Sequence, residues 1–474
     1  MSQIAINPSF WSGICEFSKK LSAEDDFFVV SHHDADGISS CAITVDMLRR
    51  LGKNVDFMCI KQLDSITIGE VKAKGDKNFV FTDFGSGQLP IIEQNGVKNF
   101  FIIDHHPPER EYERQINPHF YGYDGGLDVS GAGMAYLVAK SLGFEEMAHI
   151  AVVGAVGDMQ DSNGKLHSLN RIILEDAVRH GLMKFKHDLR LFGRQSRPLS
   201  QMLTYSSEPV LPGLTANPSS SAQFLENLGI VLKNSSGQWK TYVDLTWAER
   251  KKLTSALYMH LLDYNTPEFV IQGMVGEVYT LLNEEKKTEL RDAKEFATLL
   301  NACGRQDNPA LGVRVCLGDR GEAWIHAKSL LEKHRQMLRE GIDYLSNNGV
   351  KSCDNLYYFD AGGSIKESII GVIAGMAYGA RLIPPDKPIL AFAVDKDDPD
   401  LIKVSARANW GLVRKGIHLG KAMKEQSKEV GGEGGGHDIA AGARIPKDRR
   451  NDFIDGVNKV FRAQLSSQPA KPSS

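Results

Sequence analysis

The chain has 474 residues and a formal net charge of −3, with 42% hydrophobic and 24% charged residues. This length exceeds one ordinary hydrophobic core and predicts two or three domains. The charge balance excludes a uniformly basic surface that wraps duplex DNA, although it is compatible with a local basic groove.

The cysteines and the apolar runs indicate the compartment. Single cysteines are scattered along the chain without a C-x-x-C pair, which gives no support for a zinc ribbon and is typical of a reducing cytoplasm. No apolar run approaches the ~20 residues of a membrane helix. The first residues, MSQIAINPSFW, lack the basic and apolar regions of a signal peptide. We therefore expect a cytoplasmic protein without a membrane segment.

Four apolar runs in the N-terminal part are each followed by Asp or His. They lie within residues 27–40 (FFVVSHHDADGISS), 78–85 (NFVFTDFG), 98–106 (KNFFIIDHH) and 149–161 (HIAVVGAVGDMQD), and we expect each run to be a strand. Helix-like segments such as LPIIEQNG lie between them. This alternation predicts a parallel sheet with both faces covered by helices. Ligands of such sheets bind outside the carboxyl ends of the strands, where the charged residues fall.

Three further segments have the pattern of helices. Residues 130–143 begin with a serine N-cap and end before a glycine. Residues 288–305 carry apolar side chains at helical spacing, with Gly304 as the predicted stop signal. Residues 324–345 form one long polar pattern, which suits a helix that connects two domains.

Changes in composition divide the chain into four parts. We expect an α/β domain at 1–180, a mostly helical middle region at 181–345, a second α/β domain at 346–463 and a disordered polar tail at 464–474.

Acidic and imidazole side chains collect at the predicted strand ends. So many carboxylates cannot all be ionised in one place without a positive charge beside them, and metal ions are the simplest source of that charge. A mixed Asp/His set suits Mn²⁺, Zn²⁺ or Fe²⁺ better than Ca²⁺. Enough ligands are present for two ions, which together activate a water and stabilise phosphate oxygens during displacement at phosphorus. The candidates are His32, His33, Asp34, Asp36, Asp83, Asp104, His105, His106, Asp158 and Asp161, the last of which we interpret as a turn residue.

Five motifs in this order resemble those of the DHH phosphoesterase family. They are HHDADGISS, FTDFG, IIDHHPP and GAVGD in the N-terminal part, and GGEGGGHDIAAGARIP near the C-terminus. The middle segments TELRDAKEFATLLNACGR and DLRLFGRQSRPL are similar to archaeal RecJ-type single-strand exonucleases, some of which accompany the GINS replication complex. The resemblance implies an N-terminal parallel-sheet DHH domain, a helical middle region and a C-terminal α/β DHH-associated domain, with the active site in the cleft between domains.

The resemblance also implies a role for each charged residue. Asp34 and Asp36 are expected to bind different ions, Asp83 to bridge the two, and His105 and Asp158 to complete the second site.

Three histidines and one aspartate need separate treatment. His106 is expected to face the scissile phosphate as a hydrogen-bond donor, and Asp104 to hold an imidazole in its working tautomer. Relatives carry a histidine four positions before the first aspartate, where this chain has Val30. His32 is the expected replacement ligand, with His33 as the less favoured alternative.

Other segments are candidates for substrate binding. The glycines of GGEGGGH, including Gly434, Gly435 and Gly436, leave backbone N–H groups bare, which favours an anion nest; a flexible linker is the alternative. The resemblance implies that His437 and Arg407 contact substrate phosphates.

A basic run at residues 179–197 directly follows the first domain. It is either a solvated helix face or a contact surface for a nucleic-acid backbone, through Arg190, Arg194 or Arg197.

The resemblance implies a two-metal exonuclease, with Mn²⁺ favoured and Mg²⁺ or Co²⁺ possible, that degrades single-stranded DNA or RNA to mononucleotides in replication or repair. It favours DNA and 5′→3′ digestion, with RNA and 3′→5′ digestion as the alternatives because relatives of this type include RNA-trimming and 3′→5′ enzymes. The same family contains phosphodiesterases of oligoribonucleotides and small nucleotides, and an inactive eukaryotic relative that is a structural helicase subunit. A small-nucleotide enzyme and a replisome scaffold that binds GINS are therefore the alternatives.

Overall fold

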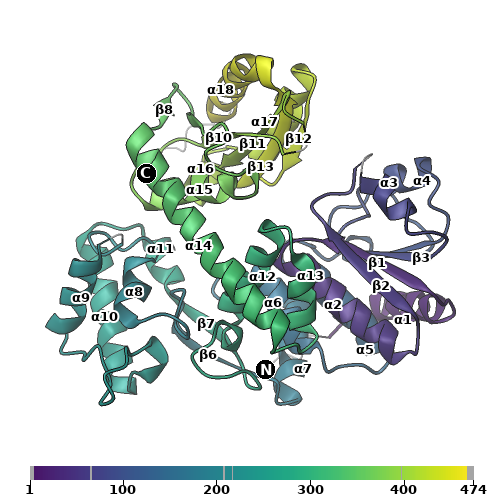
Figure 1. Cartoon of the computed structure of the whole chain (residues 1–474), viewed down its shortest axis with the longest axis horizontal. Coiled ribbons are helices and arrows are strands. Elements are labelled where there is room, and N and C mark those ends of the chain that lie inside the picture. The colour runs from purple at the N-terminus through teal and green to yellow at the C-terminus, as the bar shows by residue number, and fades with distance from the viewer. Residues whose placement is uncertain (1–4, 65–66, 207–208, 216, 397, 467–474) are drawn as a thin grey trace, which may run out of the picture. The chain divides into compact units, whose positions relative to one another are not determined.

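The computed structural model describes residues 5–64, 67–206, 209–215, 217–396 and 398–466. The chain divides into two compact units, Met1–Glu332 and Lys333–Ser474. The boundary falls within the long helix α14 (Glu322–Asn348), which confirms the predicted connector helix (Figure 1). Of the predicted tail, 467–474 lie outside the described residues, and 464–466 belong to the last helix, α18.

The first unit contains the predicted parallel sheet. Its five strands have the order β2-β1-β3-β4-β5, and all neighbours are parallel. Strands β1, β3 and β4 correspond to three of the predicted strands, whereas β2 and β5 were not expected. The strands are β1 (Phe27–His32), β2 (Val55–Ile60), β3 (Asn78–Thr82), β4 (Phe100–Ile103) and β5 (Gln115–Ile116).

Helices cover both faces of this sheet because successive apolar side chains of each strand point to opposite faces. Phe27 and Val29 of β1 pack into a core with α1, α2 and α5, whereas Phe28 and Val30 pack with α3 and α4. The helices are α1 (Pro8–Ser22), α2 (Ala35–Arg50), α3 (Thr67–Lys72), α4 (Leu89–Gln94) and α5 (Gly131–Ser141). The Ser130 side chain caps α5, as predicted for 130–143.

The fourth predicted strand is wrong. Residues 148–157 form helix α6 (Ala148–Gly157), and Asp158 is its C-cap. A short run that is apolar on every side does not distinguish a buried strand from a buried helix. Small residues let α6 approach its neighbours closely, since a Cβ on Gly154 would lie 2.4 Å from Ala132 Cβ and one on Gly157 would lie 2.6 Å from Ala35 Cβ.

The middle region is mostly helical, as predicted, and has its own hydrophobic core. Residues 183–189 of the basic run 179–197 form β6, which pairs with β7 in a two-stranded antiparallel sheet, so the helix-face alternative is wrong for these residues. The helices and strands that follow α6 are α7 (Ser168–Arg179), β6 (Met183–Leu189), α8 (Leu199–Thr204), α9 (Pro218–Asn227), α10 (Trp247–Asp263), α11 (Glu268–Gly273) and β7 (Val275–Leu281).

Two helices after β7 pack into the hydrophobic core of the N-terminal sheet. They are α12 (Ala293–Arg305) and α13 (Pro309–Cys316), and their apolar side chains, such as Phe296 and Val313, join the same cluster as α2. The helix predicted at 288–305 thus begins later, at Ala293, because Asp292 caps it through the backbone N–H groups of residues 294 and 295.

The second unit is built on a six-stranded sheet of order β12-β13-β11-β10-β9-β8. All its neighbours are antiparallel except β9 and β10. Helix α15 packs on one face, and α17 and α18 pack on the other. The elements are β8 (Lys351–Ser352), β9 (Tyr357–Asp360), α15 (Glu367–Gly379), β10 (Ile389–Val394), β11 (Leu401–Arg407), α16 (Trp410–Arg414), α17 (Leu419–Glu429), β12 (Glu433–Gly436), β13 (Ala440–Pro446) and α18 (Arg450–Ser466).

Among the described residues, we find no helix with both the length and the apolar character that crossing a membrane requires.

Candidate metal centre

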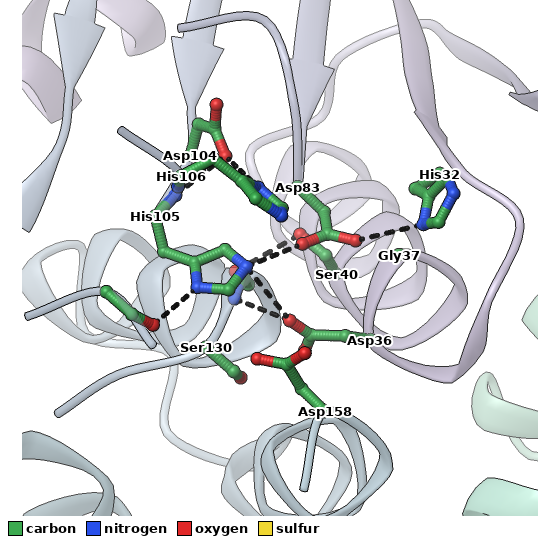
Figure 2. Close-up of polar contacts among 12 residues, drawn as sticks. His32, Asp36, Gly37, Ser40, Asp83, Asp104, His105, His106, Ser130 and Asp158 are labelled. Carbon is green, nitrogen blue, oxygen red and sulfur yellow. Dashed lines mark hydrogen bonds and ion pairs between the residues drawn. The ribbon is translucent and has the colours of Figure 1, made fainter. Parts of the chain in front are cut away.

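The predicted charged residues meet at the carboxyl edge of the first sheet (Figure 2). Strands β1, β3 and β4 end level with one another, since Ser31 pairs with Thr82 and Thr82 pairs with Ile103. The residues that follow these strand ends therefore project from one edge, and α6 adds Asp158 from below the sheet edge in Figure 2.

The first group of potential metal ligands consists of His32, Asp34 and Asp83. The His32 Nδ1 atom lies 3.0 Å from Asp34 Oδ2 and 3.7 Å from Asp83 Oδ2. Asp34 is also the N-cap of α2, where its Oδ1 accepts a hydrogen bond from Gly37 N at 3.0 Å. Burial lowers the pKa of His32, but the two carboxylates outweigh it and raise this pKa to about 9. The site therefore attracts a positive charge.

His33 is not a member of the ligand groups that the described residues form. Burial and the neighbouring His32 lower the pKa of His33 to about 4. Its carbonyl oxygen lies against α12, where a Cβ on Gly304 would be 1.8 Å away. Gly304, the predicted stop signal, thus lies in the last turn of α12 and allows this close contact. The geometry favours His32 over His33 as the first-motif ligand.

The second group consists of Asp36, His105 and Asp158. The His105 Nδ1 atom lies 2.7 Å from Gly125 O, so it donates there and turns Nε2 toward the carboxylates. Nε2 lies 3.7 Å from Asp36 Oδ2. The two Asp36 oxygens accept hydrogen bonds from the N–H groups of residues 131 and 132, at the start of α5. These backbone donors fix the carboxylate in the buried core of the site.

Asp83 belongs to the first group, reaches the second, and forms a third group of potential ligands with His105 and His106. One of its oxygens is 3.1 Å from His105 Nε2 and the other is 3.7 Å from His32 Nδ1. Its φ of 63° is left-handed, which is uncommon outside glycine and typical of functional positions. A Cβ on Gly131 would lie 2.4 Å from Asp83 Oδ1, so glycine is required where α5 begins.

Buried carboxylates crowd together in this site. Burial and the negative charges of Asp36 and Asp34 raise the pKa of Asp83 well above its usual value. Loss of water around its carboxyl group, opposed by His105, raises the pKa of Asp158 to about 6. Carboxylates that repel each other beside imidazole nitrogens are the donor set that a divalent cation fits, because the cation removes the repulsion.

His106 and Asp104 form an ion pair beside Asp83. His106 Nδ1 lies 2.9 Å from Asp104 Oδ1, and Asp104 also accepts hydrogen bonds from the N–H groups of Ser86, His105 and His106. Burial opposes ionisation of Asp104, but His106 and these bonds hold the pKa of Asp104 well below its usual value. Burial likewise opposes the charge on His106, but the Asp104 carboxylate outweighs it and raises the pKa of His106 to about 9. The imidazole is thus held as a cation with its other nitrogen outside this pair.

Sequence reasoning missed Gln160 and Gly125. Gln160 Nε2 lies 2.8 Å from Asp158 Oδ2 and 2.8 Å from Gly125 O, the same oxygen that His105 contacts. Gln160 lies two residues after Asp158, outside the GAVGD motif, and nothing in its residue type distinguishes it from a surface glutamine.

Asp161 and Arg194 also lie outside the ligand groups. Asp161 is paired with Arg190, at 2.6 Å between Oδ2 and Nη2, which agrees with its interpretation as a turn residue. Arg194 is only 4% exposed and contacts Asp188 and Asp292 at 3.0 and 3.1 Å. This burial argues against Arg194 as a substrate-binding residue and gives it a structural role instead.

The glycine-rich segment of the second unit is a strand, which corrects the expected anion nest. A nest needs alternating helical conformations, whereas residues 433–436 form β12 and pair with β13. The linker alternative is wrong for the same reason. A Cβ on Gly434 would lie 2.8 Å from Met423 O in α17, and one on Gly420 would lie 2.0 Å from Gly436 O. A Cβ on Gly435 would meet nothing within 4 Å.

Arg407 and His437 both adjoin the backbone of Ala440, at one end of this sheet. Arg407 pairs with Ala440 across β11 and β13, and His437 N donates to Ala440 O at 2.9 Å. The guanidinium of Arg407 lies against α15, since a Cβ on Gly371 would be 2.4 Å from Arg407 Nη2.

Three domain models match the chain in sequence. The N-terminal domain of the DHH family matches residues 26–156, a DHH-CID domain matches 191–275 and a DHHA1 domain matches 361–463. Uncharacterized protein MJ0831 of Methanocaldococcus jannaschii is 31% identical over 446 residues, with 92% of this chain and 93% of the relative covered. The single-stranded-DNA-specific exonuclease RecJ of Bacillus subtilis is 23% identical over 193 residues, with 36% of this chain and 24% of that protein covered.

Solved structures share the fold. RecJ from Thermus thermophilus, in complex with Mn²⁺, aligns with a TM-score of 0.59 at 17% identity over 98% of this chain, which spans 56% of that protein. CDC45 from Entamoeba histolytica aligns with a TM-score of 0.62 at 14% identity over 96% of this chain and 98% of that protein. The order of the three domains, the relative that covers nearly the whole chain and the shared architecture agree. The chain therefore belongs to the DHH family and is a RecJ-like member of it, with a DHH, a DHH-CID and a DHHA1 domain.

Proposed function

We propose that this protein is a two-metal-dependent exonuclease that hydrolyses single-stranded nucleic acid to mononucleotides. The observation that carries the proposal is the position of Asp83, whose two oxygens face the two ligand groups from one strand end. Sharing one carboxylate brings two cations close enough to act on the same phosphate.

The residues present fit two divalent ions. His32, Asp34 and Asp83 would hold one, and Asp36, His105, Asp158 and Asp83 would hold the other. The mixed carboxylate and imidazole set favours Mn²⁺, with Mg²⁺ or Co²⁺ as alternatives. When bound, two such ions supply a nucleophile from water at neutral pH and stabilise charge on the phosphate oxygens.

His106 would contribute a hydrogen bond to a non-bridging phosphate oxygen. Asp104 occupies its Nδ1 and orients the ring, which leaves Nε2 to donate. The His106 side chain is 42% exposed, in contrast to the buried Asp104, so a phosphate can reach it. Its raised pKa keeps the imidazole protonated at neutral pH, as a donor to a phosphate requires.

The second unit would bind phosphates of the same strand. Arg407 and His437 adjoin one backbone position, and the open face of Gly435 allows a sugar–phosphate backbone to approach the strand. Similarity to an enzyme named as specific for single-stranded DNA favours DNA as the substrate. The 5′→3′ polarity and the role in replication or repair are part of the proposal and rest on the resemblance of the sequence motifs alone.

The proposal is tested with strands labelled at the 5′ or the 3′ end, as DNA and as RNA, and incubated with Mn²⁺. We expect mononucleotides from one end, and no cleavage by the Asp83→Asn variant. The matched control is Asp161→Asn, which removes a carboxylate of the same domain that pairs with Arg190. Cleavage of only very short oligonucleotides would indicate a small-nucleotide phosphodiesterase instead, and no cleavage of any substrate would contradict the proposal.

A second candidate function is that of a scaffold for the GINS complex. The fold similarity to CDC45 extends over nearly the whole of both chains. In the region matched by the DHH-CID model, α10 exposes Tyr258, Met259 and Leu262 on one face, at 43–55% exposure. Substituting Met259→Glu and Leu262→Glu should abolish binding to the GINS complex of the same organism in a pull-down, and leave cleavage unchanged. Unchanged binding would contradict a scaffold that uses this face.

A further inference from the structure

One buried amide joins two residues of the second ligand group. Gln160 is 3% exposed, and its Nε2 lies 2.8 Å from Asp158 Oδ2 and 2.8 Å from Gly125 O. A longer contact of 3.3 Å reaches Val129 O. One NH₂ group thus faces three oxygen acceptors and shares two hydrogens among them.

The Gly125 carbonyl continues this connection to the other ligand. It accepts from His105 Nδ1 at 2.7 Å, and this bond directs His105 Nε2 into the cluster. Asp158 follows helix α6 and His105 follows strand β4, so the two come from elements far apart in the sequence. Gln160 and Gly125 O are the hydrogen-bonded bridge between them.

The surroundings dictate which way the Gln160 amide points. With the amide reversed, Oε1 would face the oxygens of Gly125, Val129 and Asp158 and repel all three. In the observed orientation Oε1 accepts from Asn170 Nδ2 at 2.5 Å, and Asn170 is 1% exposed on α7. The Asn170 amide thus orients the Gln160 amide. Through Gln160, it fixes the Asp158 carboxylate and, by way of Gly125 O, the His105 imidazole.

We propose that Gln160, oriented by Asn170, is a positioning residue that sets the affinity of the second metal site. The inference rests on the proposed function only through its metal centre, and deepens it by distinguishing the two sites. The ligands His32 and Asp34 have no contact with Gln160 among the hydrogen bonds of the described residues, so their site should not depend on it.

The test is calorimetric titration of the full-length protein, stripped of metal, with Mn²⁺. Wild type should bind two ions. Gln160→Met, which keeps the length but removes the donors, and Gln160→Glu, which places an acceptor against three acceptors, should weaken one ion about 10- to 100-fold and leave the other unchanged. In electron paramagnetic resonance, the signal of a coupled Mn²⁺ pair should give way to that of a single ion.

The matched control is Gln195→Met. Gln195 is a second buried glutamine of the same unit, at 6% exposure, whose Oε1 accepts from Lys287 N and has no role in the ligand groups. This variant should bind both ions as wild type does, which separates positioning from a general loss of stability. Circular dichroism and thermal unfolding check that each variant is folded.

Asn170→Asp keeps the inference open to refutation if the Gln160 variants do not fold. Its carboxylate would draw the Gln160 NH₂ group away from Asp158, so the same single ion should weaken although Asn170 touches no ligand. Wild-type affinity for both ions in folded Gln160 or Asn170 variants would overturn the inference alone. Failure of wild type to bind two ions would overturn the metal centre and the inference together.

Discussion

The carboxyl edge of the first sheet and strand β12 of the second sheet are built from opposite kinds of residue, although we assign both to the same substrate. The first gathers ionisable side chains in a buried place, where burial and the charges of Asp36 and Asp34 raise the pKa of Asp83. The second removes side chains altogether, so that α17 lies directly on the strand at Gly434 and Gly436.

The difference shows which residues lower and which raise the stability of the folded protein. Charges held together at the first edge destabilise the protein until a cation joins them, whereas the glycines of β12 stabilise it by close packing, whatever is bound. Removal of the Asp83 carboxylate should therefore lower activity without lowering stability. Filling a closely packed glycine at the second region should lower stability.

The largest expected effect comes from Asp36→Asn and Asp83→Asn. Each should lower kcat by at least about 10³-fold, or about 4 kcal/mol of transition-state stabilisation, because a metal ligand is lost. They should differ in stability. Asp36→Asn replaces one of the two accepting oxygens by an NH₂ group, which then faces the N–H group of residue 131 or 132, and should lower the free energy of unfolding by about 1–3 kcal/mol.

Asp83→Asn should instead stabilise the metal-free protein, and more so as pH rises. The pKa of Asp83 is raised in the folded state, so its contribution is favourable below its unfolded pKa and is lost as pH increases. Denaturant unfolding in a chelator between pH 5 and 8 measures this. A destabilised Asp83→Asn at pH 8 would show that the carboxylates do not repel, and would break the contrast between the two regions.

Gly420→Ala should have the next largest effect, and act only on stability. The added Cβ would lie 2.0 Å from Gly436 O and would force α17 away from β12. We expect a loss of about 3 kcal/mol for the second unit, measured by denaturant unfolding, with Mn²⁺ affinity unchanged. Loss of Mn²⁺ binding in this variant would mean that the two regions are not energetically separate.

Mn²⁺ itself should stabilise the first unit. At a free concentration 100 times its Kd, one bound ion raises the free energy of unfolding by about 2.7 kcal/mol. Thermal unfolding with and without Mn²⁺ should show this rise in wild type, and a smaller one in Asp83→Asn. An equal rise in both proteins would place the ion elsewhere than at Asp83.

The smallest change in stability should come from Gly435→Ala, which is the matched partner of Gly420→Ala. Its Cβ would meet open space, so the free energy of unfolding should change by about 0.5 kcal/mol or less. If a substrate backbone approaches this face, KM for single-stranded DNA should rise severalfold at constant kcat. An unchanged KM would remove Gly435 from the substrate surface.

Much of the first edge could be predicted from the sequence, because the residue types themselves mark it. His32, Asp34, Asp83 and His105 are polar residues at or within two positions of the ends of apolar strands, and a parallel sheet brings such positions to one edge. Asp158 was placed correctly for a wrong reason, since α6 and not a strand presents it.

The rest depends on three-dimensional context that residue types do not carry. Gln160 and Gly125 act through an amide and a carbonyl, groups that occur throughout the chain. Arg194 belongs to a basic run of the kind that contacts nucleic acid, but it pairs with Asp188 of β6 and with Asp292 before α12, and it is buried. The run of glycines was ambiguous because bare backbone serves a ligand and a packed helix equally well.

The left-handed backbone at Asp83 has a consequence for the evolution of this fold. Asparagine tolerates this conformation as aspartate does, and the codons of the two residues differ by a single base. One mutation can therefore remove the shared carboxylate without straining the chain, and it also relieves the repulsion around it. A lineage released from selection for hydrolysis would lose the reaction easily and keep the architecture, ready for use as a structural component.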